Sequence, residues 1–203
     1  MPPIYHITHV NNLPGIIANG RLICDRAAQD LKLVNIAHNN IKERRLRKPV
    51  PVGPGGTVGD YVPFYFAPLS PMLYAIFKNQ VAGYTAGQQP VIYLCSSTEA
   101  VHTANCRWVF TEGHAVMDFT DFFDDFKDLR RIDWPLMQAK YWFATDAQPD
   151  RSRRRQAEFL VHHFFPWNLV TKIVVYDAAS AKAVSDILKG QAPPVEIKRG
   201  WYY

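Results

Sequence analysis

One carboxylate in this sequence stands where it could take part in chemistry. Glu158 follows the basic run 151–155 and leads directly into the apolar residues 159–161. The two-residue period of a strand puts Glu158 on one face together with Gln156 and Leu160. The surroundings of such a carboxylate set its charge, and the arginines offer positions for phosphate groups. The segment predicts an electrostatic or acid–base site; the alternative is an exposed edge strand with a solvated basic lead-in.

Two polar residues near the start of the chain could hold a ligand. Residues 4–8 (IYHIT) predict a first strand, and a helix is expected over 13–18, between Asn11-Asn12 and Gly20. His6 and Thr8 would share one face of this strand. The alternative is a strand histidine whose hydrogen bonds are satisfied within the protein.

A second basic run, residues 42–48, ends a helix that we predict over 27–47. The closely spaced prolines that follow prevent regular structure from continuing. An arginine in this run, such as Arg44, could clamp a phosphate, because a guanidinium makes planar bidentate contacts. A solvated helix face is the alternative.

The aromatic segment in the middle of the chain predicts a strand over 61–66 and a short helix that begins at Ser70-Pro71. Its glycines lack the following Lys-Ser/Thr of a phosphate-binding loop, which excludes that motif. Tyr65, Ser70 and Tyr74 would together form a stacking slot for a flat aromatic ring.

The rest of the chain predicts an α+β fold. Strands are expected over 90–95, 172–176 and 195–197, and a helix over 179–188. Residues 118–134 alternate Phe and Leu with Asp and predict a partly amphipathic helix. Its aspartates lack the pattern of a calcium loop. No internal repeat interrupts this order.

Size and composition favour one globular domain, residues 1–203. Apolar residues make up 48% of the chain and charged residues 20%, so wholesale disorder is not expected. The net charge is +5 and the basic residues are clustered, which indicates a polyanionic partner. Three widely spaced cysteines predict neither a disulfide framework nor a metal site. Without a signal peptide or an apolar run of membrane-spanning length, we expect a cytoplasmic protein.

The order of these motifs resembles the ADP-ribosyltransferase superfamily, in which a residue of the first strand, a Tyr or Ser of a central strand and a late Glu surround NAD. The resemblance is closer to the DarT family of bacterial DNA ADP-ribosyltransferase toxins and covers most of the chain. It rests on the blocks YHITHVNNLPGI, IKERR, GGTVGDYVPFYFAPLSPMLYAI, FTEGHAV, YW, RRRQAEFLVHHFFPW and the closing WYY. It implies a split, strongly bent β core with flanking helices and NAD in the cleft. It also implies transfer of ADP-ribose to thymidine, or to guanosine in another branch, in single-stranded DNA, with no metal and with a macrodomain antitoxin, DarG, that reverses the reaction.

The resemblance also implies roles for individual residues. Glu158 would bond the ribose 2′-hydroxyl and stabilise positive charge at the anomeric carbon, or take the thymine N3 proton. Arg44, with Arg45 as the second choice, would neutralise the diphosphate. The predicted NAD contacts are His6, Thr8, Tyr65, Met72 and Tyr74. The predicted DNA contacts are His114, Tyr141, Trp142, Arg153, Arg154 and Arg155, since aromatic rings stack on unpaired bases and arginines follow the backbone; Trp142 in the core and His114 as a plain turn residue are the alternatives.

Three other functions fit parts of the sequence. An NAD-dependent RNA 2′-phosphotransferase shares the His-x-Thr start but does not need the late Gln156-x-Glu158 pair. Transfer to a protein side chain also uses a Gln-x-Glu pair. A non-catalytic nucleic-acid-binding module would use the basic runs but would gain nothing from Glu158.

Overall fold

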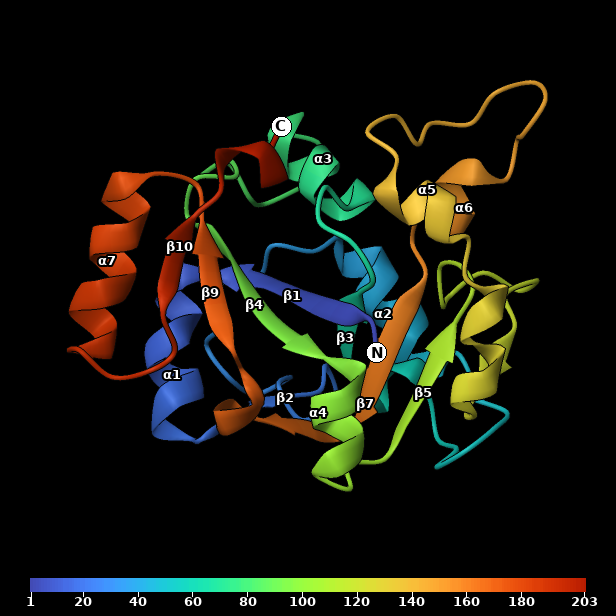
Figure 1. The fold of residues 1–203 in the computed structure, drawn as a ribbon, viewed down its shortest axis with the longest axis horizontal. Coiled ribbons are helices and arrows are strands. Elements are labelled where there is room, and N and C mark those ends of the chain that lie inside the picture. Colours follow the sequence, from blue (N-terminus) through green and yellow to red (C-terminus); the bar gives the residue numbers. More distant parts are fainter.

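The β-branched and aromatic segments of the chain assemble into one eight-stranded sheet, described for residues 1–203 by a computed structural model (Figure 1). Its strands, in spatial order, are β10 (Val195–Ile197), β9 (Lys172–Val175), β4 (Val91–Ser97), β1 (Pro3–His9), β3 (Tyr61–Tyr65), β7 (Glu158–His162), β5 (Trp108–Thr111) and β6 (Phe122–Phe123). Neighbours run antiparallel except β10 and β9. Two further strands, β2 (Arg21–Ile23) and β8 (Phe164–Pro166), pair with each other.

The sheet is split between β1 and β3. These strands meet at one register pair, Tyr5 with Tyr65, whereas β1 pairs with β4 along its whole length. Four strands therefore lie on each side of the split. A split β core is what the resemblance implied. A binding cleft can open here because the backbone ladder of the sheet is interrupted.

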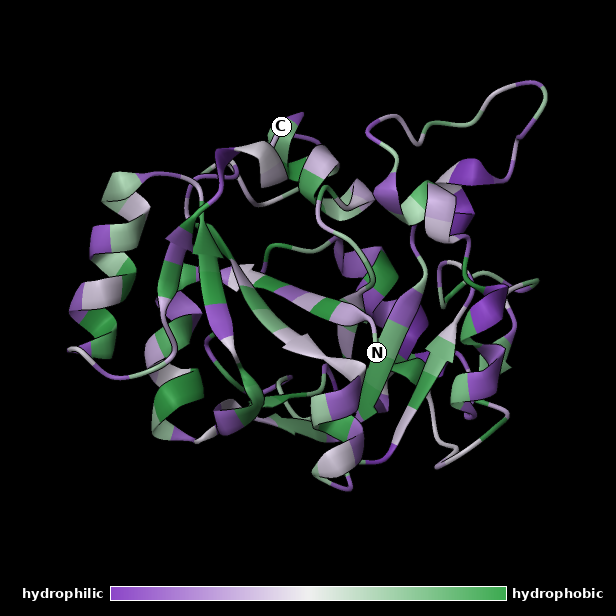
Figure 2. Cartoon of the chain, viewed as in Figure 1, coloured by the Kyte–Doolittle hydropathy of each residue, from purple (hydrophilic) through white to green (hydrophobic).

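The strand that begins at Glu158 lies inside the sheet. β7 pairs with β3 on one side and with β5 on the other, so the alternative of an exposed edge strand is wrong. Phe64 and Phe110 are both register partners of Phe159, and all three rings are buried. Apolar residues dominate the central strands in Figure 2, and their burial supplies the main stabilisation of the fold.

Seven α-helices surround the sheet. They are α1 (Leu13–Ala18), α2 (Asn39–Arg47), α3 (Pro71–Phe77), α4 (Thr98–Thr103), α5 (Trp134–Gln138), α6 (Arg151–Arg154) and α7 (Ala178–Leu188). Short 3₁₀ helices complete the chain: η1 (Val10–Asn12), η2 (Val58–Asp60), η3 (Phe126–Arg131), η4 (Trp167–Leu169) and η5 (Arg199–Trp201). No helix has both the length and the apolar character needed to cross a membrane.

The helix predicted over 27–47 is shorter than expected, because only α2 forms. The preceding segment is held by side chains that replace helical hydrogen bonds. The Asn12 side chain accepts from the Val34 N–H (2.8 Å) and donates to the Val34 carbonyl (3.0 Å). Asn35 donates to Asn39 Oδ1 and caps the Ala37 N–H.

The helix predicted over 118–134 is wrong. Phe123 instead pairs with Phe110 in the sheet, so this segment forms β6, η3 and the start of α5. Asp125 caps the N–H of Lys127 and Asp133 that of Leu136. Both aspartates thus cap the starts of separate short helices and do not lie within one long helix.

Candidate active site

A cavity of about 320 Å³ opens at the split in the sheet. This is at the lower end of the size range of small-molecule sites. It is lined by β1, β3, β7, α2, α3 and the segment that precedes α2; the lining side chains used below are His6, Thr8, Asp25, Arg45, Tyr65, Met72, His114, Gln156 and Glu158. Residues from both ends of the sequence therefore meet in one place.

A buried ion pair lies in this cavity. Arg45 Nη1 donates to Glu158 Oε2 at 2.7 Å, and Arg45 Nε donates to Asp25 Oδ2 at 2.9 Å. The Arg45 and Glu158 side chains are only 7% and 4% exposed. Arg45 Nη2 is also buried and has no hydrogen-bond partner. One guanidinium donor thus remains available inside the cavity, at a site where an unpaired polar group is costly.

The ionised form of Glu158 is strongly favoured by this arrangement. Burial raises the pKa of the carboxyl, but the nearby Arg45 charge, His114 and the Ala115 N–H outweigh it and lower the pKa to about 2. Asp25 and Glu158 raise the pKa of Arg45 against the opposing effect of burial. Both members of the pair are therefore charged at neutral pH.

Helix α2 is positioned so that Arg45, and not Arg44, enters the cavity. Gly59 in η2 lets α2 approach closely, since a Cβ at this position would lie 2.9 Å from the Leu46 Cα. The Arg26 side chain donates to the Leu46 carbonyl and to Thr57. Arg44 is exposed and donates to the Val116 carbonyl instead. Arg45 therefore lines the cavity and Arg44 does not, and the choice between them as the diphosphate contact stays a prediction.

The second oxygen of Glu158 is held by the loop after β5. The Ala115 N–H donates to Oε1 at 3.1 Å, and His114 Nδ1 lies 3.4 Å from the same oxygen. The His114 N–H in turn donates to the Arg153 carbonyl of α6. His114 faces the cavity, as one of its two sequence interpretations predicted.

His6 and Thr8 both line the cavity. His6 Nδ1 lies 2.8 Å from the Pro63 carbonyl and therefore donates to it, which leaves Nε2 as an acceptor. Burial lowers the pKa of His6, so the ring is neutral at physiological pH. Thr8 accepts a hydrogen bond from Asn12 Nδ2.

The predicted stacking residues separate into two groups. Tyr65 is the register partner of Glu158 and lines the cavity with Met72. Burial raises the pKa of the Tyr65 hydroxyl, with a further contribution from the Glu158 charge. Tyr74 is not part of the lining; it packs edge-on against Trp142 at 5.8 Å. The structure thus does not place Tyr74 beside the cavity.

The predicted DNA contacts also differ in exposure. Tyr141 is 72% exposed, whereas Trp142 is buried and donates from Nε1 to the Tyr203 hydroxyl at 2.8 Å. Arg155 is buried as well and donates to the Pro68 carbonyl. Trp142 and Arg155 therefore support the fold at this place, and their side chains are not open to a nucleic acid in this conformation.

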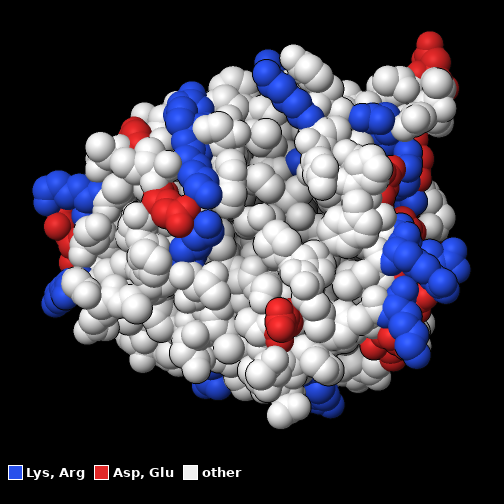
Figure 3. All heavy atoms as spheres, viewed as in Figure 1, with Lys and Arg blue, Asp and Glu red and all other residues white.

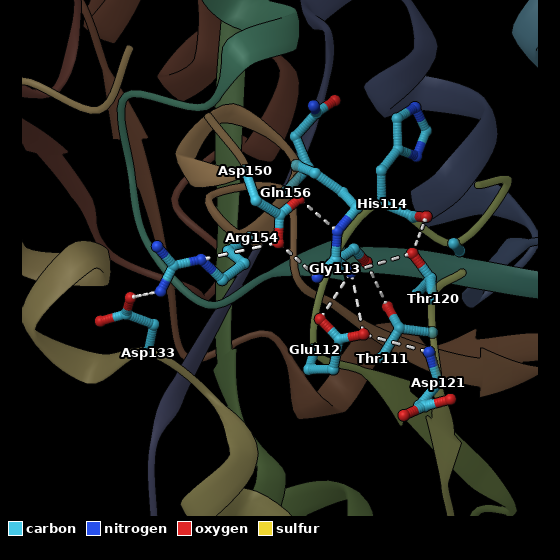
Figure 4. Close-up of polar contacts among 12 residues, drawn as sticks. Thr111, Glu112, Gly113, His114, Thr120, Asp121, Asp133, Asp150, Arg154 and Gln156 are labelled. Atoms are coloured by element: carbon cyan, nitrogen blue, oxygen red, sulfur yellow. Dashed lines mark hydrogen bonds and ion pairs between the residues drawn. The ribbon is translucent and has the colours of Figure 1, made fainter. Parts of the chain in front are cut away.

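Arg153 and Arg154 both form ion pairs with acidic residues. Figure 4 shows Arg154 between Asp133 and Asp150. Arg153 bridges Glu112, at 2.6 Å, and Asp150, at 2.7 Å. Arg154 pairs with Asp133 and lies near Asp150. Basic and acidic side chains also lie interleaved along the right-hand edge of the surface in Figure 3. Arg153 and Arg154 are therefore neutralised by carboxylates of the protein, whereas Arg151 and Arg155 donate to uncharged oxygen atoms of Gln148, Tyr141 and Pro68.

The sequence analysis missed Asp25 as a residue of the site. It lies two residues after β2 and anchors Arg45. An acidic residue directly after a short strand is a weak signal, and nothing in its spacing connects it with residues 45 or 158. Ala115 was missed because its backbone N–H, and not its side chain, contacts Glu158.

Comparison with known proteins agrees with this geometry. The family model described as "ssDNA thymidine ADP-ribosyltransferase, DarT" matches residues 5–203. A DNA ADP-ribosyl transferase of Thermus sp. (strain 2.9) is 44% identical over 205 residues, covering 99% of this chain and 96% of the relative. The structure of Thermus sp. 2.9 DarT in complex with ADP-ribosylated ssDNA matches with a TM-score of 0.94 at 43% identity, covering 100% of this chain and 96% of the other. Its complex with NAD⁺ matches with a TM-score of 0.90 at 41% identity, covering 100% and 98%. The chain belongs to the DarT family of single-stranded-DNA thymidine ADP-ribosyltransferases.

Proposed function

We propose that this protein transfers ADP-ribose from NAD to the base of thymidine in single-stranded DNA and releases nicotinamide. The observation that carries the proposal is the Arg45–Glu158 pair inside the cavity, in a chain of this family. NAD supplies the ADP-ribosyl group and a leaving group that departs as a neutral ring. The protein must therefore hold a diphosphate, a ribose and a flat ring in one geometry.

The cavity contains groups that fit these parts of NAD. Arg45 has a buried N–H without a partner, which suits an anionic phosphate oxygen. The free Nε2 of His6 and the Thr8 hydroxyl are suited to the ribose or amide groups of the ligand. Tyr65 and Met72 offer apolar surface for the nicotinamide ring.

Glu158 acts as a carboxylate that stabilises positive charge on the ribose as nicotinamide leaves. With a pKa of about 2 it is ionised at every physiological pH, but it is also a weak base while it remains paired with Arg45. Proton removal from the thymine therefore requires Arg45 to turn from Glu158 towards the phosphates first. Asp25 would keep Arg45 anchored during such a movement.

The segment before β7 receives the DNA. Tyr141 offers an exposed ring, and Arg151 donates to its carbonyl, so the loop is fixed at that point. Arg153 orients His114 through its backbone carbonyl. Arg154 would contact the DNA backbone only by leaving Asp133.

The same proposal includes the extent of the catalytic domain, its cell compartment and its antitoxin. Residues 1–203 act as a single catalytic domain. NAD and transiently single-stranded DNA are both found in the bacterial cytoplasm, so the protein works there. As the family resemblance implies, a macrodomain antitoxin of the DarG type removes the modification.

The proposal is tested by measuring nicotinamide release by liquid chromatography. The protein is incubated with NAD alone, with oligo-dT and with oligo-dA, each single-stranded. We expect release to be strongest with oligo-dT and to match the amount of modified DNA. Two further mixtures contain RNA or protein in place of DNA, and release that depends on either would assign a different acceptor. No release in any mixture, with DNA binding retained, would identify a binding module.

A further inference from the structure

Helix α3 presents a cluster of aromatic rings on the side away from the cavity. Its residues Met72 and Ala75 line the cavity, and Leu73 and Ile76 are buried in the core. Tyr74, Phe77 and Lys78 lie on the remaining side of the helix. This third face meets the loop after α5 and the end of the chain (Figure 1). We call the rings gathered here the aromatic platform: Tyr74, Phe77, Trp142, Phe143 and Tyr203.

The platform is built around Tyr74. Its ring packs edge-on against Phe143 at 5.1 Å and against Tyr203 at 5.0 Å. Phe77 stacks on Tyr203 at 5.9 Å, and Trp142 stacks on Phe143 at 4.4 Å. Tyr74 thus contacts both stacked pairs, Phe77 with Tyr203 and Trp142 with Phe143.

Hydrogen bonds fix the inner rings of the platform. The Tyr203 hydroxyl accepts from Trp142 Nε1 and donates to the Leu69 carbonyl at 2.7 Å. The indole N–H of Trp142 and the hydroxyl of Tyr203 are therefore paired within the protein. The platform is held rigid before any ligand arrives, which reduces the entropy cost of binding.

The outer rings of the platform remain in contact with solvent. Phe77 is 47% exposed and Phe143 is 44% exposed. Their neighbours within the platform cover only one side of each. Adjacent exposed aromatic residues of this kind mark an interaction surface more often than isolated ones do.

The charge that α3 brings to the platform is positive. Lys78 is the only Lys, Arg, Asp or Glu between Asp60 and Glu99, the part of the chain that contains α3. The Lys78 ammonium lies 6.0 Å from the ring centres of both Tyr74 and Phe77. Aromatic rings beside cations are the usual means of binding single-stranded nucleic acid without strict sequence preference.

We propose that the aromatic platform stacks on bases of the DNA strand several nucleotides away from the modified thymidine. This inference rests on the proposed function and adds a second contact region to it. The platform connects with the cavity through α3 and with Glu158 through the loop that leads into α6 and β7. In this proposal the strand leaves the cavity over α3 and places its outer bases on Phe77 and Phe143.

The first test compares oligonucleotides of different length. One carries the thymidine in a strand of roughly 12 nucleotides and the other in a trinucleotide. We expect the wild-type protein to show a lower KM for the longer strand. Replacing the bases outside the central trinucleotide by abasic sites should remove this advantage, although the phosphates remain. Equal KM values for all three substrates would overturn the proposal.

The second test uses the double variant Phe77→Ala/Phe143→Ala. Because each stacked base contributes about 1–3 kcal/mol, the advantage of the longer strand should fall by about 10-fold or more. The variant should also become insensitive to abasic substitution. Phe164→Ala is the matched control, since Phe164 is 42% exposed and carries the Arg21 guanidinium 5.3 Å above its ring. An unchanged length advantage in the double variant, or an equal loss in the control, contradicts the platform.

The outcomes separate this inference from the proposed function. If the wild-type protein modifies the trinucleotide and the longer strand with equal KM, the proposed function stands and the platform is wrong. A platform that docks a protein would give this result. If neither strand is modified, both are wrong.

Discussion

Arg45 and Arg153 each bridge two carboxylates, but their surroundings differ. Arg45 joins Asp25 and Glu158 inside the cavity and retains one buried donor without a partner. Arg153 joins Glu112 and Asp150 nearer the surface, and its donors are taken up by these residues and by Thr120. The Asp150 side chain is 43% exposed, compared with 4% for Glu158.

This difference distinguishes an arginine that can bind a ligand from an arginine that stabilises the fold. Charges that remain in water are screened and contribute little to stability, whereas a buried pair depends on each partner for its solvation. Arg45 Nη2 has no hydrogen-bond partner in the protein and can therefore donate to a ligand. The saturated Arg153 instead fixes the segment between α6 and the loop that contains His114. The predictions below test this contrast.

The largest effect is expected from Glu158→Ala. Transfer of ADP-ribose should fall by about 100-fold or more, the scale for loss of a well-placed electrostatic group. The change also leaves Arg45 with Asp25 as its only counterion, so stability should fall by about 3 kcal/mol. Quantifying modified oligonucleotide and unfolding in urea measures the two effects separately. Glu158→Gln keeps the side-chain shape, and its full activity would refute the charge-based role.

The second prediction compares the rate losses caused by replacing two neighbouring arginines. Arg45→Ala removes the cavity guanidinium, and we expect a rate loss of about 100-fold together with weaker NAD binding. Arg44→Ala removes an exposed side chain bonded to the Val116 carbonyl and should change the rate less than about threefold. Steady-state kinetics and calorimetric NAD titration give the comparison. A larger loss for Arg44 than for Arg45 would restore the choice favoured by the sequence.

The third effect concerns acid stability. The pKa of Glu158 is lowered from 4.5 to about 2 in the folded protein. Its ionised form therefore stabilises the fold fully above pH 4.5, and this contribution disappears as the pH falls towards 2. The difference in unfolding free energy between wild type and Glu158→Gln should narrow through this window. A difference that stays constant with pH would show that the carboxylate is not held in its charged form.

The smallest effect is expected from Arg153→Ala. Loss of its charged hydrogen bonds to Glu112 and Asp150 should reduce stability by about 2 kcal/mol. Transfer of ADP-ribose to oligo-dT should fall much less than in Arg45→Ala, because Arg153 does not line the cavity. Thermal unfolding and the rate of oligo-dT modification check this. A rate loss as large as that of Arg45→Ala would remove the contrast between the two arginines.

Local patterns were enough to predict much of the fold and part of the site. Residues 4–8 lie in β1, and Glu158 leads into the predicted strand as the first residue of β7. Gln156, predicted on the same strand face, lies in the turn before β7. His6, Thr8 and Glu158 line the same cavity. These positions follow from strand alternation, which depends only on neighbouring residues.

Other features depend on contacts far along the chain and could not be predicted. The choice between Arg44 and Arg45 depends on how closely α2 approaches Gly59. Trp142 is buried because Tyr203, 61 residues later, accepts its N–H. Arg153 and Arg154 looked free in the sequence, but in the folded protein their charges are matched by Glu112, Asp133 and Asp150.

Mass spectrometry of single-stranded oligonucleotides incubated with NAD tests the central claim most directly. Two strands that differ only in whether they contain thymidine are compared with the wild-type protein, Arg45→Ala and Glu158→Ala. We predict the mass increment of ADP-ribose only on the thymidine-containing strand, and only with the wild-type protein at short times. An increment on the strand without thymidine, or equal modification by all three proteins, would contradict it.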